Sequence, residues 1–443
     1  ADRRTALLAA FLLGCSHWAA RSGRTGWDAV LLVALQLAAL ACLAKARRFR
    51  TLPPALAGGG LLGASLYTYV AARLAVLQAV VWLAWEAFAA RRRRAAGDDL
   101  PAGPPRALAQ LALCVGGMVA VAGPFLLRLW LLRPELLTVR VAELSVFARH
   151  GAGEPWLTLG RNLLGHLLMF HVRGGAYARD ALPGFPMLDP ITGALLLAGL
   201  VVVALAGDWR RRLLLSWPLV MVLGGVLSTS GEGPPFPYRV SSLAPWSCLV
   251  AALGGVALWD AATGSFAATP RRRLLARGIA AVALAAVVVI NGWALLVAWP
   301  ADPGTRRAFG TTPTRVGRWL AVHRAGRPTL ILRGALRPPA LPAGYPYAAA
   351  NRTDFFREGD AVAAVQLAAG LYRAHPARAL APLLPGGDVD FATALPGALA
   401  APTLLVMAPE RAAEATRRFA VAARWELRDD GKGPLVTILL AQP

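Results

Sequence analysis

Long apolar runs separated by short polar turns dominate the first 300 residues of the chain. A helix needs roughly 20 mostly apolar residues to cross the hydrocarbon core of a membrane. Nine runs approach that length, so the pattern predicts an all-α polytopic membrane domain over residues 1–300. The predicted spans lie at about 5–19, 27–45, 54–70, 73–90, 106–127, 191–207, 212–230, 242–260 and 277–299.

Two regions break this pattern. Residues 128–190 form one long loop with amphipathic pieces at Leu136–Phe147 and Leu157–Phe170, which we expect to lie flat in the membrane interface. Residues 301–443 are more polar and alternate between strand and helix signals, which predicts a small α/β domain. Its expected helices are Thr314–Ala325 and Glu410–Trp425, and its expected strands are Pro328–Leu332, Pro402–Met407 and Pro434–Leu440.

Arginine clusters set the expected orientation of the spans. Short cytoplasmic loops of membrane proteins are rich in Lys and Arg. Here such clusters fall at every second boundary: Arg3-Arg4, Lys45 to Arg50, Arg91 to Arg94, Arg210 to Arg212 and Arg271 to Arg273. We therefore expect these boundaries in the cytoplasm, and both the 128–190 loop and the 301–443 domain outside it.

Composition excludes two classes of protein. The chain is 56% hydrophobic and only 16% charged, so it is too apolar to be disordered. Its 47 Lys and Arg against 24 Asp and Glu give a net charge of +23, but the basic runs are short and lie between apolar segments with few aromatic neighbours. This is not the pattern of a nucleic-acid-binding surface, so we expect no nucleic-acid partner.

Motifs for metals and cofactors are absent from the sequence. No zinc-binding histidine pattern occurs, and the four cysteines lie singly in apolar runs, so we expect no metal site and no disulfide framework. There is no phosphate-binding Walker loop, and we expect no cofactor. The glycines Gly58, Gly59, Gly60 and Gly63 lie within a predicted span, where small residues let helices approach closely.

Polar side chains gather at the expected outer face, and polar groups in a membrane protein mark a functional site by default. Arginines lie beside tyrosines there, and the guanidinium fork binds phosphate through two hydrogen bonds while tyrosine donates another. Aromatic belts and snorkelling arginines produce a similar pattern. The candidate residues for binding a lipid phosphate are Arg73, Arg239, Tyr67, Tyr69, Tyr238 and Arg179.

Four stretches of the chain resemble one enzyme family. They are Arg4–Ala29, with its His-Trp turn; Leu56–Arg73, with Tyr-Thr-Tyr followed by Arg; Met169–Leu200, with Pro-Gly-Phe-Pro and Leu-Asp-Pro; and Pro235–Gly255, with Arg and Pro in a turn. Together they are similar to the polyprenyl-phosphate-sugar-dependent glycosyltransferases of the GT-C superfamily. Within that superfamily the closest resemblance is to the branch of bacterial protein mannosyltransferases and the lipid A aminoarabinose transferase.

The resemblance implies a GT-C-like fold in a bacterial cytoplasmic (inner) membrane and transfer of a sugar from a polyprenyl phosphate to an extracytoplasmic acceptor, with inversion. It also implies that Arg73 and Arg239 contact the lipid phosphate, supported by Tyr67 and Tyr69, under a roof formed by the Arg179–Asp189 loop. The family's catalytic acids lie in a first outer loop, and this chain begins near the family's third span. We therefore expect the general base upstream of Ala1.

Within the chain, Asp28 and Asp180 are the alternative acids for that role. The family's Gly-Asp pair in the long loop reads Gly174-Gly175 here, which removes one further acid. We accordingly expect this chain alone to bind the lipid carrier without transferring sugar. A lipid-linked-sugar flippase and a non-catalytic scaffold derived from the enzyme are the alternative functions.

Overall fold

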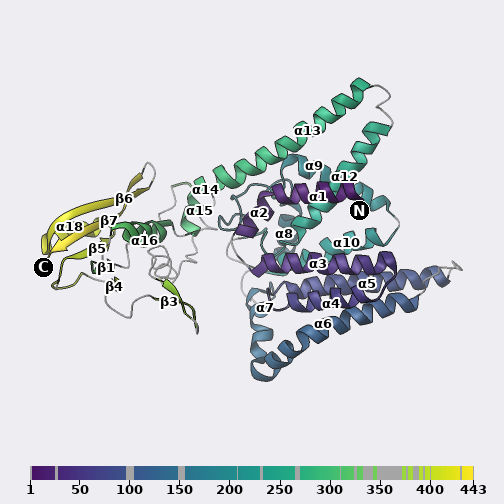
Figure 1. Ribbon diagram of the computed structural model, residues 1–443, viewed down its shortest axis with the longest axis horizontal. Helices are drawn as coiled ribbons and strands as arrows, with labels where there is room; N and C mark the ends of the chain where they lie inside the picture. The colour runs from purple at the N-terminus through teal and green to yellow at the C-terminus, as the bar shows by residue number, and fades with distance from the viewer. Residues whose placement is uncertain are drawn as a thin grey trace. The chain divides into compact units, whose positions relative to one another are not determined.

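The computed structural model divides the chain into two compact units, Ala1–Trp299 and Pro300–Pro443 (Figure 1). Each unit is considered by itself. The structure describes residues 2–24, 28–95, 104–147, 155–206, 208–229, 233–264, 270–309, 311–323, 327–332, 343–346, 372–375, 378–382, 389–392, 395–399, 401–429 and 432–442.

The first unit is helical. Among the residues that the structure describes, five helices are long and apolar enough to cross a membrane, which supports a membrane protein. These five lie in α3 (Asp28–Phe49), α5 (Ala72–Ala95), α6 (Pro104–Leu132), α12 (Leu243–Gly264) and the segment Arg271–Ala301, which begins within α13 (Pro270–Trp293). They correspond to five of the nine predicted spans.

The other four predicted spans are shorter helices. They are α1 (Arg3–Cys15), α4 (Pro53–Ser65), α9 (Pro190–Leu205) and α10 (Trp209–Met221), with 13, 13, 16 and 13 residues. A helix of 13 residues is about 20 Å long, against a hydrocarbon core of about 30 Å. The count of nine spans is therefore not confirmed.

Glycines bring α4 and α6 together, and α3 to α6 lie side by side in Figure 1. A Cβ atom on Gly59 would overlap the carbonyl group of Cys114 in α6, and one on Gly63 would lie 2.7 Å from the Met118 carbonyl oxygen. In the other direction, a Cβ atom on Gly117 would overlap the Leu56 carbonyl. The structure thus confirms that these glycines serve helix packing.

Three arginine-rich boundaries meet at one end of this unit. Arg47 of α3 donates from Nη2 to Oε2 of Glu86 in α5 at 2.7 Å, and Arg212 of α10 donates to the other oxygen of the same carboxylate. Gln110 of α6 accepts from Arg47 Nη1 at 3.3 Å. The Glu86 side chain is 2% exposed, so this cluster joins four helices through one buried acid.

The long loop contains η1 (Pro134–Leu137), α7 (Val139–Leu144) and α8 (Pro155–Leu168). The predicted piece Leu136–Phe147 is thus two short helical segments, followed by a β-bridge from Ser145 to Ser228. The second predicted piece is α8. Its polar side chains are buried and its large apolar side chains are exposed, the reverse of a helix in a water-soluble protein. Its buried residues are Asn162 and His166, whereas Trp156, Leu157, Leu163, Leu164 and Leu167 are exposed. Such a helix suits a surrounding lipid phase rather than water.

The second unit contains a five-stranded sheet with the order β4-β1-β5-β7-β6. Strands β4 (Val389–Ala392), β1 (Thr329–Leu332) and β5 (Thr403–Met407) are parallel, and β7 (Lys432–Gln442) and β6 (Ala420–Asp429) continue it antiparallel. Because side chains of a strand alternate, Leu404 and Val406 pack with α16 (Thr311–His323) and Leu405 and Met407 with α18 (Pro409–Arg418). The helices therefore cover opposite faces of the sheet.

Most elements predicted for this unit are present, with one correction. The predicted helix Glu410–Trp425 ends at Arg418, and Ala420–Trp425 belongs to β6. The reason is a partner distant in sequence: this segment pairs with β7 from Ala420 opposite Gln442 to Trp425 opposite Ile438. The two remaining described strands, β2 (Tyr372–His375) and β3 (Arg378–Pro382), form a separate antiparallel pair.

Candidate functional site

The site begins with α2 (His17–Arg24), a short helix directly after α1. The Ser16 hydroxyl accepts a hydrogen bond from the Ala19 N–H at 3.3 Å, as an N-cap residue does. His17, Trp18 and Arg21 lie on the buried face, because residues three and four apart share one side of a helix. The Arg21 residue is 3% exposed, which places a guanidinium group inside the protein.

Asp180 of the long loop is the counter-ion of Arg21. Arg21 Nη1 lies 3.5 Å from Asp180 Oδ1 and donates to the Arg179 carbonyl oxygen at 3.2 Å. Arg179 Nε donates to the same Oδ1 at 3.1 Å. Asp180 is 2% exposed, and a buried charge needs such partners to offset its lost hydration. One enclosed carboxylate thus holds the side chains of both Arg21 and Arg179.

Tyr238 connects Arg179 with Arg239. The Arg179 guanidinium lies 5.7 Å from the ring centre of Tyr238 and 4.7 Å from that of Tyr177. Arg239 donates from Nε to the Tyr238 hydroxyl at 2.9 Å, and both of its Nη atoms donate to the Thr229 carbonyl oxygen at 3.3 Å. Its guanidinium also lies 4.6 Å from the centre of the Phe236 ring. Arg239 therefore fixes Tyr238 in place.

Two buried histidines support this region as neutral hydrogen-bonding groups. Burial lowers the pKa of His17 to about 4, and its Nε2 donates to the Pro186 carbonyl at 3.0 Å. Burial likewise lowers the pKa of His166 to about 4; its Nδ1 donates to the Asn162 carbonyl, and its Nε2 accepts from the Phe236 N–H at 3.1 Å. His166 thus anchors the segment that carries Tyr238 and Arg239.

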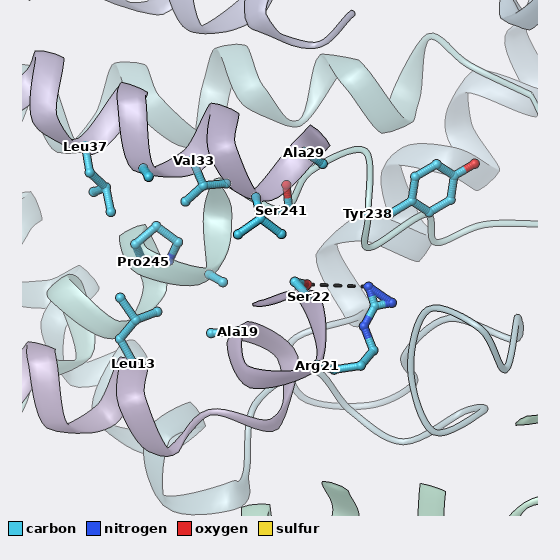
Figure 2. Close-up of a pocket in the computed structure, with 13 residues that line it drawn as sticks. Leu13, Ala19, Arg21, Ser22, Ala29, Val33, Leu37, Tyr238, Ser241 and Pro245 are labelled. Carbon is cyan, nitrogen blue, oxygen red and sulfur yellow. Dashed lines mark hydrogen bonds between the residues drawn. The ribbon is translucent and has the colours of Figure 1, made fainter. Parts of the chain in front are cut away.

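A cavity of about 200 Å³ lies beside these groups. Figure 2 shows apolar side chains of α1, α3 and α12 along its wall, with Arg21, Ser22, Tyr238 and Ser241 supplying polar atoms. The cavity is lined by Leu13, Ala19, Arg21, Ser22, Ala29, Val30, Val33, Ala34, Leu37, Tyr238, Ser241, Ala244 and Pro245. Its shape and chemistry suit an amphipathic molecule with an apolar chain and an anionic group.

The structure brings some of the predicted site residues together and separates others. Tyr238 lines the cavity, and Arg179, Asp180 and Arg239 lie around it through the contacts above. Tyr67 points elsewhere: its hydroxyl donates to the Val121 carbonyl at 2.8 Å and its ring stacks on Phe125 of α6.

The remaining predicted residues lie near the same turns. Tyr69 is half-buried, and the exposed Arg73 lies at the start of α5. Its neighbour Leu74 packs near the Gly224–Arg239 region, because a Cβ atom on Gly224 would lie 3.1 Å from Leu74 Cδ1 and 2.9 Å from the Arg239 carbonyl oxygen. Asp28 begins α3, but its side chain lies outside the described residues.

Arg21 is the functional residue that sequence reasoning missed. It lies within the stretch Arg4–Ala29 but was not among the candidate residues for binding a lipid phosphate. The available signal was its spacing from His17 and Trp18, which predicts one shared helix face. Among the described residues, no group of three His, Cys, Asp or Glu side chains could hold a metal ion.

Comparison of the chain with protein-family models, with curated protein sequences and with solved structures finds no match. The function is therefore argued from the geometry of the site, and the GT-C resemblance of the sequence enters it as an expectation.

Proposed function

We propose that this protein is a membrane glycosyltransferase that moves a sugar from a polyprenyl-phosphate donor to an acceptor outside the cytoplasmic membrane. The observation that carries the proposal is the cavity between α1, α3 and α12, with apolar walls and the guanidinium of Arg21 among its lining groups. A prenyl chain matches the apolar walls, and its phosphate matches the arginine and tyrosine groups. The GT-C resemblance adds the sugar to this lipid.

The reaction follows from the chemistry of such a donor. The acceptor oxygen forms a bond to the anomeric carbon while the bond from that carbon to the phosphate oxygen breaks. The phosphate leaves with the electron pair, and a base takes the acceptor proton. Negative charge grows on the departing phosphate, where positioned cations and hydrogen-bond donors stabilise the transition state.

Residue roles in this proposal follow from the contacts. Arg21 and Tyr238 line the cavity proposed for the phosphate, Arg179 lies against the Tyr238 ring, and Arg239 holds the Tyr238 hydroxyl. Asp180 positions Arg21 and Arg179.

The proposal includes a topology. The three arginine-rich boundaries that meet at Glu86 lie in the cytoplasm, as the positive-inside rule expects. The α2 segment, the long loop and the second unit lie outside. Reporter fusions after residues 95 and 211 should be cytoplasmic, and one after residue 310 should be external. A cytoplasmic reporter at residue 310 would contradict the outer active site.

The activity is tested with the full chain in lipid nanodiscs. A polyprenyl phosphate carrying a radiolabelled hexose is supplied together with bacterial envelope protein and lipid A as acceptors. Movement of the label to an acceptor, with polyprenyl monophosphate as the second product, would support the glycosyltransferase and would mean that an acid within this chain, Asp28 or Asp180, serves as the base. In proteoliposomes, movement of the intact donor between leaflets without loss of sugar would instead indicate a flippase. Binding of the donor with neither outcome would indicate a scaffold.

A further inference from the structure

Arg21 holds an unusual position in the cavity. Among the described residues that line it, Arg21 is the only one with a charged side chain. Figure 2 shows its guanidinium bonded to the hydroxyl of Ser22 in the same helix, with Tyr238 further along the same cavity. Charged groups are rarely buried to this extent unless they bind a partner of opposite charge.

The guanidinium of Arg21 is only partly satisfied by the protein. Nη1 meets the Arg179 carbonyl oxygen and Asp180, and Nη2 makes a long 3.4 Å bond to the Ser22 hydroxyl. Its Nε is buried and has no hydrogen-bond partner. Nε and Nη2 belong to one edge of a guanidinium, which is the edge that binds two oxygens of a phosphate. Within the protein this edge therefore makes only the one weak bond to Ser22, and Arg21 lines the cavity.

The group formed by Arg21, Arg179 and Asp180 has a net positive charge. Asp180 Oδ1 is shared by Arg21 and Arg179, so two guanidinium charges face one carboxylate charge and one net positive charge remains. Oδ2 of Asp180 is buried without a partner. Arg21 and Asp180 also line a second cavity of about 10 Å³, beside His17 and Trp299, which is about the room that one water molecule needs.

Arg239 is less suited to contact the ligand directly. All three of its nitrogen atoms already donate to protein oxygens, at Tyr238 and Thr229, and it does not line the cavity. Its effect on a ligand passes through the Tyr238 hydroxyl. Arg21 and Arg239 thus make different contacts, and a direct contact of Arg239 with the phosphate stays a prediction.

We infer that Arg21 is the residue that binds the phosphate of the lipid carrier, and that Asp180 is the positioning residue that orients Arg21 toward it. This inference rests on the proposed function for the class of ligand, a prenyl chain with an anionic phosphate. The apolar wall formed by Val33, Leu37 and Leu13 accounts for the chain, and the net positive charge at Arg21 accounts for the phosphate.

The test measures binding of farnesyl phosphate to the full chain in detergent by calorimetry. Arg21→Gln should weaken binding by about 30- to 1000-fold, which is the usual effect of removing one partner of a buried charge-assisted contact. Arg21→Lys should recover part of the affinity, since it keeps the charge but loses the fork. Arg133→Gln, at an exposed arginine, is the matched control and should bind like the wild type.

The positioning role has its own readouts. Asp180→Asn should weaken binding while Asp180→Glu restores part of it, a rescue that a merely structural role would not require. The double variant Arg21→Gln/Asp180→Asn removes both fully buried charges and takes this partner only from the partly exposed Arg179, so it should keep the fold while binding stays lost. Thermal unfolding of each variant confirms that folded protein is compared.

The possible results distinguish the role of Arg21 from the proposed function. Unchanged affinity in Arg21→Gln, with wild-type binding intact, would overturn the role of Arg21 and leave the proposed function standing. A wild-type protein that does not bind farnesyl phosphate would overturn both. Farnesol should bind far more weakly than farnesyl phosphate. If inorganic phosphate competed as well as farnesyl phosphate, the site would recognise the phosphate group alone, and the assignment to a lipid phosphate would be wrong.

Discussion

Arg47 and Glu86 form a 2.7 Å ion pair between α3 and α5, with the carboxylate 2% exposed. Arg212 of α10 binds the other oxygen of Glu86, so one acid balances two cations that are themselves mostly buried. Removing a partner from such a cluster costs more than a surface salt bridge contributes, because the remaining charges stay desolvated. This relationship makes Glu86 the residue on which the packing of these three helices depends.

Glu86→Gln should therefore destabilise the first unit. The change leaves Arg47 and Arg212 without their negative partner, and we expect the free energy of unfolding to fall by about 3–5 kcal/mol. Unfolding by a denaturing detergent, followed by circular dichroism, measures the effect. Glu135→Gln, at an exposed acid, serves as control and should change stability little. Equal stability of the two variants would contradict the role given to Glu86.

Two neighbouring glycines of α4 provide a matched pair. Gly59→Ala places a Cβ atom into the Cys114 carbonyl of α6, and we expect a loss of about 1–3 kcal/mol or more from the forced separation of the helices. At Gly60 the added Cβ atom would lie 3.7 Å from Val121 Cγ2, an ordinary contact. Gly60→Ala should be neutral or slightly stabilising, since Ala favours a helix. Similar melting temperatures in both variants would argue against the close α4–α6 packing.

Arg239 and Arg73 should affect turnover. In a glycosyltransferase of the proposed kind, Arg239→Ala and Arg73→Ala should each reduce donor binding or turnover by about 30- to 1000-fold. For Arg239 the reason is loss of the bond that fixes the Tyr238 hydroxyl. Steady-state kinetics with a labelled donor give kcat and KM for each variant. Normal values in both would show that these arginines only anchor the protein at the interface.

Stability should depend on pH through the two buried histidines. The pKa of His17 and of His166 is lowered by burial from 6.5 to about 4, so the unfolded state binds more protons between these values. The free energy of unfolding should then fall as pH drops from about 6.5 to 4, by about 3 kcal/mol per histidine, with no contribution above 6.5. His166→Gln should reduce this slope relative to the wild type. Parallel stability curves for the two proteins would refute the explanation.

The sequence predicts those elements of the fold that depend on the local pattern of residues. The five long helices follow from apolar length alone, and strands β1, β5 and β7 lie within two residues of their expected bounds. The end of α18 at Arg418 could not be predicted, because the helical spacing of apolar residues continues through Trp425. What ends the helix is the pairing of β6 with β7, a contact that no local pattern contains.

The site could be predicted only in part, because some of its contacts join residues that are distant in the sequence. Arg179, Tyr238 and Arg239 were selected because arginine beside tyrosine suits a phosphate, and the structure does gather them. Arg21 owes its position to Asp180, which lies 159 residues further along the chain. Tyr67 and Arg73 share one turn in sequence, yet the side chain of Tyr67 packs on α6. Proximity in sequence does not decide which way a side chain turns.

The Asp189 carboxylate has a wider consequence, since its two oxygens make different bonds. Oδ1 caps α9 by accepting from the Ile191 and Thr192 N–H groups, and Oδ2 accepts from the Thr192 hydroxyl and from Asn291 Nδ2 of α13 at 2.9 Å.

Asn291 in turn accepts from the His17 N–H, so the start of α2 depends on the same acid. An asparagine at position 189 could act as the cap, but its amide nitrogen would meet a donor instead of accepting from one. In a library of random variants, positions 189 and 291 should therefore tolerate few residues. A substitution at either position should disrupt the same set of hydrogen bonds.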